Sequence, residues 1–270
     1  MRRAVLFRPG ADFPSISVTG RSCALMCRHC QGRYLQGMTP VQGPEELLSS
    51  AEGLVARGAE GFLLSGGCDD QGKVPLSPYL DTVRRIKSTM PLDVNLHPGL
   101  VSEDEAAEIA RSDADRISFD LVLDDDVIRN DMHMDRSPTD YLRSFHALCR
   151  AASGRVTPHI LLGLGDEKME LEAVKVAASE DVPCVILLSL LGEKVDDWQE
   201  RLVRAVEIGA SSPVPIILGC MRPRGHPGTE MAAMEAGAAG IACPSPATVG
   251  AIKGKGWEIV WRKECCAFYR

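Results

Sequence analysis

Several features that would point to other classes of protein are missing from this sequence of 270 residues. It lacks a basic excess, since its formal net charge is -7 at pH 7, and a nucleic-acid-binding surface would require a basic face. It lacks a secretory signal pattern, because the apolar run after Arg3 already ends at Arg8. No apolar run approaches the roughly 20 residues that a membrane-spanning helix requires. We therefore expect a cytoplasmic protein that acts on neither nucleic acid nor membranes.

A glycine-rich dinucleotide-binding turn is also missing after the first predicted strand, which argues against an open doubly wound sheet. Instead, short apolar stretches alternate with helical patterns. Strands are predicted at residues 15–18, 61–65, 92–97, 116–119, 157–162, 184–188, 215–218 and 240–242. Helices are predicted to begin at residue 44 and to lie at residues 79–88, 103–111, 139–152, 169–179, 198–208 and 229–236. This alternation predicts parallel βαβ units and a closed (β/α)8 barrel of the TIM type. We expect a barrel over residues 1–256 and a tail over residues 257–270.

The cysteines indicate metal chemistry. Ten cysteines in a chain without a signal indicate a reducing compartment, where clustered thiols bind metals or act in catalysis more often than they form disulfides. Cys23, Cys27 and Cys30 follow a C-x3-C-x2-C spacing, and three thiolates can hold three irons of a [4Fe-4S] cluster while the fourth iron stays open. Zinc is the alternative, but it prefers four ligands in two pairs, and no second pair follows at the usual spacing. The spacing therefore predicts an iron–sulfur cluster.

Functional residues of such barrels sit at the carboxyl ends of the strands, which gather into a ring at the barrel mouth. The candidates on the second to fourth strands are Ser65-Gly66-Gly67-Cys68, Asn95, His97 and Asp120. On the fifth to eighth strands they are Gly163-Leu164-Gly165, Ser189, the stretch from Gly219 to Arg224, and Cys243-Pro244-Ser245. For His97, a substrate-binding role and a purely structural role at the mouth both stay open.

The remaining cysteines suggest a second cluster. Cys149 and Cys184 are expected in the core, where free cysteine is usual. The adjacent pair Cys265-Cys266 lies in the tail, and adjacent cysteines rarely bond each other without strain. We expect the tail to fold back over the barrel mouth and to form a second [4Fe-4S] site. The expected auxiliary ligands are Cys68, Cys220, Cys265 and Cys266, with Cys243 in reserve.

The C-x3-C-x2-C loop resembles that of the radical S-adenosylmethionine (radical SAM) superfamily. This resemblance implies that Cys23, Cys27 and Cys30 hold a catalytic cluster whose open iron binds SAM, which is then cleaved to a 5'-deoxyadenosyl radical. Ser65-Gly66-Gly67 resembles the motif whose carbonyls hold the SAM amino group, since glycines let the backbone approach closely; Cys68 replaces the acid that usually follows. His29 occupies a slot that usually holds an aromatic residue near the adenine. The other implied cofactor-binding residues are Asn95, Asp120 and Gly163, with Gly165 as an alternative near the adenine. The resemblance also implies that Arg222 and Arg224 steer either the SAM carboxylate or the acidic carrier protein.

Further motifs narrow the resemblance. They are Ser17-Val18-Thr19-Gly20, Gly32-Arg33-Tyr34-Leu35, Leu64 to Cys68, Gly219 to Pro223, and the Cys-Cys tail. Together they resemble the biotin-synthase-like proteins that form the two-protein lipoyl synthase. The resemblance implies a sulfurtransferase that inserts sulfur into a protein-bound octanoyl chain, with an auxiliary cluster as sulfur donor. It also implies three partners: an octanoylated lipoyl carrier protein or peptide, a second radical SAM protein, and an electron donor such as ferredoxin or flavodoxin.

Two alternatives remain. A single-cluster enzyme of this type could carry out methyl transfer, rearrangement or cofactor assembly. The other alternative is a nonenzymatic iron–sulfur carrier or partner subunit. The Ser65-Gly66-Gly67 motif argues against this alternative, because a carrier does not need to bind SAM.

Overall fold

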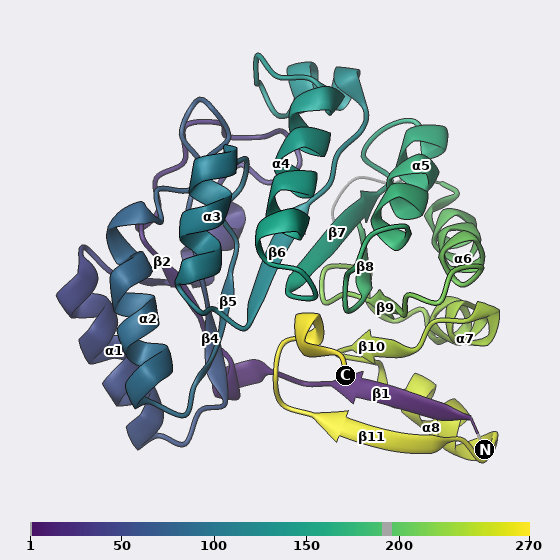
Figure 1. Ribbon diagram of the computed structural model, residues 1–270. Helices are drawn as coiled ribbons and strands as arrows, with labels where there is room; N and C mark the ends of the chain where they lie inside the picture. Colours follow the sequence, from purple (N-terminus) through teal and green to yellow (C-terminus); the bar gives the residue numbers. More distant parts are fainter. Residues whose placement is uncertain (1, 191–195) are drawn as a thin grey trace.

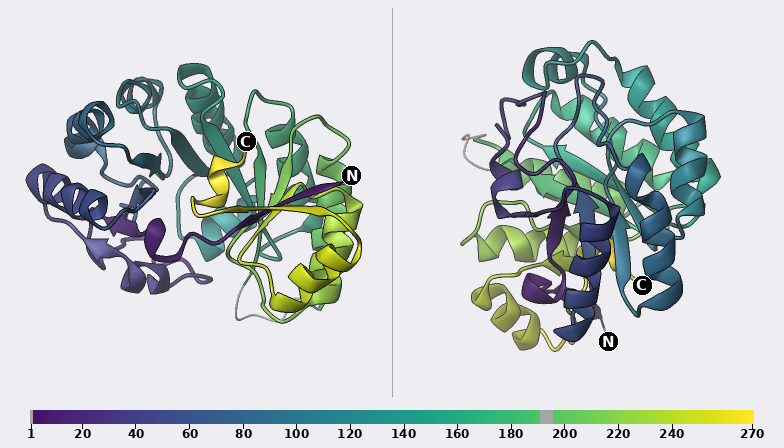
Figure 2. Two further views of the ribbon diagram at one scale, coloured as in Figure 1. Left: turned by 90° about the horizontal axis from the view of Figure 1, so that it is seen from below. Right: turned by 90° about the vertical axis from the view of Figure 1, so that its left-hand side faces the viewer.

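Eleven parallel strands form one curved sheet in the computed structural model, which describes residues 2–190 and 196–270 (Figure 1). Their order across the sheet is β11-β1-β10-β9-β8-β7-β6-β5-β4-β2-β3. The strands are β1 (Arg3–Phe7), β2 (Ser15–Ser17), β3 (Thr39–Pro40), β4 (Gly61–Ser65), β5 (Asp93–Leu96), β6 (Arg116–Asp120), β7 (Val156–Leu162), β8 (Val185–Ser189), β9 (Ile216–Leu218), β10 (Gly240–Ala242) and β11 (Glu258–Arg262). Helices pack around the outside of the curve (Figure 2).

The α-helices are α1 (Pro44–Ala56), α2 (Leu80–Thr89), α3 (Glu103–Arg111), α4 (Pro138–Ala151), α5 (Glu167–Ala178), α6 (Trp198–Gly209), α7 (Pro227–Ala236) and α8 (Pro246–Gly254). Shorter helical turns are η1 (Gly10–Asp12), η2 (Arg33–Gly37), η3 (Ser77–Tyr79), the π-helical η4 (Val127–Asp131) and η5 (Cys266–Phe268). The predicted fold class, a single α/β domain of the TIM-barrel type, is confirmed, and the predicted strands and helices are present within two residues of their expected ends. In the described part of the chain, no helix has both the length and the apolar character needed to cross a bilayer.

Local sequence explains where the helices begin. Helix α3 starts with a capping box: Ser102 Oγ accepts from the Glu105 N–H at 3.2 Å, and the Glu105 carboxylate accepts from the Ser102 N–H at 2.7 Å. Helix α1 starts with Pro44 followed by two acids, which suit the first turn of a helix and the positive end of its dipole.

The sheet remains open, in contrast to the closed ring that the strand count predicts. Strand β1 pairs in parallel with β10 on one side and with β11 on the other. At the far end β2 pairs with β4 and β3, and among the described residues no pairing joins β3 to β11. The barrel is therefore a curled sheet whose edges are β11 and β3, and the stretch after residue 257 begins as part of that sheet.

Alternate strand residues divide between the two faces of the sheet. Val185 and Leu187 belong to the large core beneath the outer helices, whereas Ile186, Ile217 and Phe7 pack with Cys266 of the tail. The tail therefore enters the inside of the barrel, which we call the lumen, and Figure 2 shows η5 within the curve of the sheet.

The tail reaches the lumen from the end opposite to the predicted one. The carbonyl of Ala267 accepts hydrogen bonds from Arg116 Nε at 3.0 Å and from Thr157 Oγ1 at 3.4 Å, and these residues lie at the amino ends of β6 and β7. The prediction that the tail folds over the mouth was thus wrong. Short-range sequence patterns cannot show on which end of a barrel a terminal segment docks.

Candidate functional site

The cysteine loop follows β2 and is seated on the glycine loop that follows β4. A Cβ atom on Gly67 would lie 2.0 Å from the Ser22 carbonyl oxygen and 2.6 Å from Cys23 Cα, so only glycine fits there. The Gly67 N–H donates to Thr19 Oγ1 at 2.6 Å, and the Ala24 N–H donates to the Cys68 carbonyl at 2.8 Å. The structure therefore brings together the two motifs that the sequence predicted to share a SAM site.

The three loop thiols lie close enough to influence one another. Burial and, to a smaller extent, the charges of Cys23 and Cys30 together raise the pKa of Cys27 to about 12. Three mutually repelling thiolates are stabilised when they share a cationic centre, because a coordinating thiol loses its proton to the metal. Across residues 2–190 and 196–270, no three His, Cys, Asp or Glu side chains are already arranged around one metal position. The thiols nevertheless fit a [4Fe-4S] cluster in number, softness and partial exposure at the mouth.

Cys68 belongs with this group. Burial raises its pKa to about 12, with additional contributions from the charges of Cys23 and Cys27. Because its carbonyl also accepts from the Ala24 N–H, Cys68 lies beside the cysteine loop, whereas the prediction grouped it with Cys220, Cys265 and Cys266. Its place in the sequence could have indicated this position, because Cys68 directly follows Gly67, and the backbone of Gly67 lies against Cys23.

Strands β5, β6 and β7 line one side of the lumen with polar side chains. Asn95 and Ser118 exchange hydrogen bonds of 2.9 and 3.1 Å. Above them His97 Nε2 lies 3.2 Å from Asp120 Oδ2, and the rings of His97 and His159 stack with their centroids 6.1 Å apart. We call these five residues the polar wall.

Charge is unevenly distributed along this wall. Burial opposes ionisation of Asp120, but the charge and the hydrogen bond of His97 outweigh it and lower the pKa of Asp120 to about 2. Burial likewise lowers the pKa of His97, and Asp120 reverses the effect, so that the pKa of His97 lies above its usual value. For His159 burial dominates and lowers the pKa to about 4. The His159 Nδ1 atom lies 3.1 Å from the Thr157 carbonyl, which can only accept, so the hydrogen is assigned to Nδ1 and Nε2 is an acceptor.

The predicted cofactor residues of this region therefore adjoin the mouth. Asp120 lies at the end of β6, and the charge of His29, from the cysteine loop, also acts on its pKa. Ser65 Oγ donates to the His97 carbonyl at 3.0 Å, which ties the glycine loop to β5. Contacts of Ser65, Gly66, Asn95, His29 and Asp120 with SAM remain predictions. The sequence analysis missed His159, although a histidine as the one titratable residue of the largely apolar strand β7 was a usable signal.

The opposite side of the lumen is apolar. Ile186 on β8, Ile217 on β9, Ala242 on β10 and Phe7 on β1 form one buried cluster, and Leu188 packs against it. We call these five residues the apolar wall. Cys266 and Cys184 belong to the same cluster, which places the Cys266 thiol among core side chains.

Cys265 lies between the two walls. It packs against the apolar cluster, and hydrogen bonds from Cys266, the Ala267 N–H and Asn95 lower its pKa against the opposing effect of burial. The charge of Cys265 also acts on Cys220. The pKa of Cys220 is raised to about 11, first by burial and then by the charges of Cys265 and Cys243. Tyr34, from the cysteine loop side, is close enough to both Cys30 and Cys220 for burial and their charges to raise its pKa. Cys220 therefore lies within electrostatic reach of Cys265 in the tail, and Tyr34 lies within reach of both Cys220 and Cys30.

Arg222 does not face a ligand. It is 1% exposed, and its guanidinium donates to the Gly219 and Ala242 carbonyls, both at 2.6 Å, and to Glu230 Oε1 at 2.6 Å. All its nitrogens are therefore occupied within the protein, and the expected contact with the SAM carboxylate was wrong. An arginine beside Pro223 in a loop looked exposed in sequence, but Arg222 is buried in an ion pair with Glu230, which lies eight residues further along the chain.

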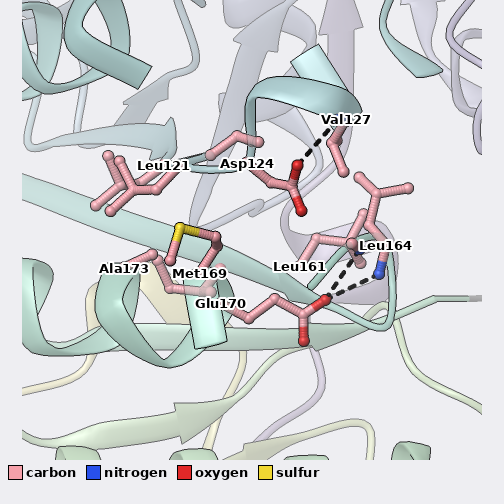
Figure 3. Close-up of a pocket in the computed structure, with 12 residues that line it drawn as sticks. Leu121, Asp124, Val127, Leu161, Leu164, Met169, Glu170 and Ala173 are labelled. Carbon is pink, nitrogen blue, oxygen red and sulfur yellow. Dashed lines mark hydrogen bonds between the residues drawn. The ribbon is translucent and has the colours of Figure 1, made fainter. Parts of the chain in front are cut away.

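The glycine loop after β7 is also committed to the protein. Glu170 Oε1 accepts from the N–H groups of Gly163, Leu164 and Gly165 at 2.8, 3.0 and 3.2 Å. Figure 3 shows the Glu170 carboxylate hydrogen-bonded to Leu164. Burial raises the pKa of Glu170, and these hydrogen bonds together with Arg201 oppose the shift. The N–H groups of Gly163 and Gly165 are therefore not available to a cofactor, and an approach of the adenine to this loop stays a prediction. The cavity drawn in Figure 3 lies between this loop, the segment after β6 and α5, away from the thiols.

Comparisons with known proteins agree with this geometry. The model of the radical SAM superfamily matches residues 17–178. The hydrogenase maturase HydG from Carboxydothermus hydrogenoformans is similar in structure, with a TM-score of 0.66, 16% sequence identity, and coverage of 99% of this chain and 70% of HydG. A second HydG structure gives a TM-score of 0.66 at 17% identity and covers 100% of this chain and 66% of HydG.

Methylornithine synthase (PylB) is similar with a TM-score of 0.62 and 14% identity, over 97% of this chain and 84% of PylB. No curated protein matches the sequence. Identities this low establish a shared fold and no shared reaction, and nothing among them singles out the lipoyl synthase branch. The family match, by contrast, spans the cysteine loop, the glycine loop and the polar wall. This chain belongs to the radical SAM superfamily, and membership implies an enzyme that uses a [4Fe-4S] cluster and SAM.

Proposed function

We propose that this radical SAM enzyme inserts sulfur into an octanoyl chain attached to a lysine of a carrier protein or peptide. The observation that carries the proposal is the position of Cys265. The tail brings its thiol into the lumen, between an apolar and a polar wall and within electrostatic reach of Cys220. A second iron–sulfur cluster held there would face the same space as the cluster at the mouth.

The bound cofactors would supply the 5'-deoxyadenosyl radical at the mouth and sulfide from the second cluster. The chain supplies the surroundings. Cys23, Cys27 and Cys30 would hold the first cluster, and the glycine loop beside them allows a ligand to approach the backbone. The curled sheet and the tail enclose the lumen, which keeps water and competing hydrogen donors from a reactive carbon.

The apolar wall suits an alkyl substrate. Each methylene group taken from water into such a surface contributes about 0.8 kcal/mol. Leu188 is only partly buried by the protein, so part of its surface is available to a chain that lies along β8. The polar wall, with its charged His97–Asp120 pair, is unsuited to that chain and suits the polar groups of a nucleoside.

The partners would dock at the cysteine loop. Residues 13–44 contain no Asp or Glu although the whole chain carries a net charge of -7. Arg21 and Arg33 are exposed there, and the apolar side chains of Met26 and Tyr34 are 48% and 42% exposed. Acidic partners, such as the carrier protein or a ferredoxin or flavodoxin, complement this surface. A second radical SAM protein remains a proposed partner, and a cytoplasmic location remains part of the proposal.

Isotope transfer tests the proposed function. The chain is reconstituted anaerobically with labelled sulfide and incubated with SAM, a reductant and an octanoyl-lysine peptide. We expect the mass of the peptide to increase by the mass of the labelled sulfur. The Cys265→Ala variant should show no such increase but should still cleave SAM to 5'-deoxyadenosine. Cys149→Ala on α4 is the control, with parental transfer. If the parent cleaves SAM but the peptide gains no sulfur, the sulfur-insertion proposal fails and a single-cluster reaction such as methyl transfer, rearrangement or cofactor assembly replaces it.

A further inference from the structure

The ends of β9 and β10 hold two cysteines at matching positions. Leu218 pairs with Ile241 in the parallel register of these neighbouring strands. Cys220 and Cys243 each follow their paired residue by two positions, so they leave the sheet side by side. Neighbouring strands are about 4.8 Å apart, which is close enough for two thiols to share one metal cluster.

An arginine joins the two cysteines. Arg224 Nη1 donates to the Cys243 carbonyl at 2.6 Å, and Arg224 Nη2 donates to the Cys220 carbonyl at 2.6 Å. One planar guanidinium therefore fixes both backbones with parallel hydrogen bonds, a geometry that lysine cannot reproduce. The bridge thus links two loops that end separate strands.

The buried Arg222 reinforces the same pair from below. Its Nη1 joins the Gly219 and Ala242 carbonyls, one residue before each cysteine, and its Nη2 lies 3.3 Å from the Cys243 carbonyl. Glu230 anchors this arginine at 2.6 Å and also accepts from the Ser245 N–H at 3.1 Å. The two arginines together tie both loops at consecutive residues.

Cys243 has an unusual backbone. Its φ of 46° lies in the left-handed region, which is costly for a residue with a side chain and persists only where the surroundings enforce it. Besides the arginines, the Phe7 carbonyl holds it by accepting from the Cys243 N–H at 2.7 Å. Such enforced strain is concentrated at functional positions.

Cys265 approaches this pair from the lumen. It packs against the cluster that contains Ala242, the residue before Cys243, whereas Cys266 is 3% exposed and belongs to the core of that cluster. The turn η5, which begins at Cys266, also contacts β10, whose last residue directly precedes Cys243.

We propose, building on the proposed function, that Cys220, Cys243 and Cys265 hold the second iron–sulfur cluster and that Arg224 and Arg222 are positioning residues for the first two. This ligand set excludes Cys68 and Cys266. Three thiolates leave one iron of a cubane for a ligand from outside the trio.

Metal and sulfide content tests the ligand set without reference to turnover. We expect roughly eight irons per reconstituted parent chain and roughly four in Cys220→Ser/Cys243→Ser and in Cys265→Ser, the count for one cubane. Cys266→Ala, which alters the adjacent residue, is expected to keep roughly eight. SAM cleavage is measured in every variant to show that the mouth cluster is intact.

The positioning role of Arg224 is tested separately. In Arg224→Gln we expect iron of the second cluster to be released to a chelator several-fold faster and its electron paramagnetic resonance signal to change, with little rescue by Arg224→Lys, which keeps the charge but cannot bridge both carbonyls in the same way. Arg204→Gln, on α6, is the control and should release iron at the parental rate. Parental release and an unchanged signal in Arg224→Gln would remove the positioning role.

The outcomes separate the two proposals. Eight irons in the Cys220→Ser/Cys243→Ser variant, or loss of four only in Cys266→Ala, would overturn this ligand set. One zinc per chain in place of the second cluster would also overturn it. If iron falls from eight to four as expected but the parent transfers no sulfur to the octanoyl peptide, the ligand set stands and the proposed function fails.

Discussion

The two walls of the lumen differ in composition and in how they are held. The polar wall is a set of hydrogen-bonded and charged side chains on β5, β6 and β7, with Asp120 52% exposed toward the mouth. The apolar wall is closely packed on β8, β9, β10 and β1, and Phe7 and Ile217 are fully buried. One half of the barrel therefore offers groups that can bind a ligand, and the other half offers stability.

This difference predicts opposite consequences of mutation. Substitutions in the apolar half should lower the free energy of unfolding more than they alter the chemistry of the mouth. Substitutions of His97, Asp120 and His159 in the polar half should do the reverse, because these side chains are partly exposed and contribute less to the core, whereas Asn95 and Ser118 below them are buried. The following predictions test this contrast, beginning with the largest expected effect.

The largest effect is expected at the buried ion pair behind the apolar wall. Arg222→Met leaves the Glu230 carboxylate, which is 2% exposed, without its cation. Removing one partner of a buried pair typically costs about 3–5 kcal/mol, whereas replacing both can be nearly neutral. Denaturant unfolding of reconstituted protein should therefore show a large loss in Arg222→Met and a recovery in Arg222→Met/Glu230→Leu. A loss below about 1 kcal/mol in the single variant would contradict a buried, fully engaged pair.

A direct comparison of the two walls should give an intermediate effect. Ile186→Ala removes a fully buried side chain and should cost about 2–5 kcal/mol, because the cavity collapses only in part. Ser118→Ala removes one partner of Asn95 and should cost about 1–3 kcal/mol. Unfolding curves of both variants provide the measurement. If Ser118→Ala were the more damaging change, the assignment of stability to the apolar half would be wrong.

The sequence could predict what is local and periodic. The alternation of strands and helices predicted the barrel class, and the spacing of Cys23, Cys27 and Cys30 beside a Gly-Gly turn predicted the family. Strands β1 and β11 escaped prediction because each pairs only with segments far away in the chain, and no helix follows β1 to mark it as a βα unit.

Residue roles that depend on tertiary contacts were also out of reach. Arg222 and Arg224 look alike in sequence, yet one is buried against Glu230 and the other bridges two carbonyls at the surface. Cys265 and Cys266 are adjacent, but Cys266 is buried within the cluster of the apolar wall, whereas Cys265 is only partly buried and packs against that cluster. The different surroundings of these two neighbours follow from the course of the tail through the barrel, which the sequence alone does not show.

The smallest expected effect concerns the pH dependence of the polar wall. Because Asp120 raises the pKa of His97, the pair stabilises the fold fully below the unfolded histidine pKa of about 6.5 and loses this contribution as the pH rises through the folded pKa of His97. The Asp120 pKa of about 2 means that the contribution persists down to about pH 4, the usual aspartate value, and is lost only below it. Both groups are partly exposed, so the contribution should stay below about 1 kcal/mol.

Unfolding of His97→Gln at several pH values measures this term. The difference in stability from the parent should be largest near pH 5–6 and should shrink toward pH 9, since only the protonated imidazole attracts Asp120 strongly. His146→Gln, whose ring lies outside the barrel 3.4 Å from Glu180, is the matched control for the loss of a histidine near an acid. A difference between His97→Gln and the parent that does not change with pH would mean that His97 contributes through packing alone. The polar wall would then differ from the apolar wall in composition but not in the kind of interaction that holds it.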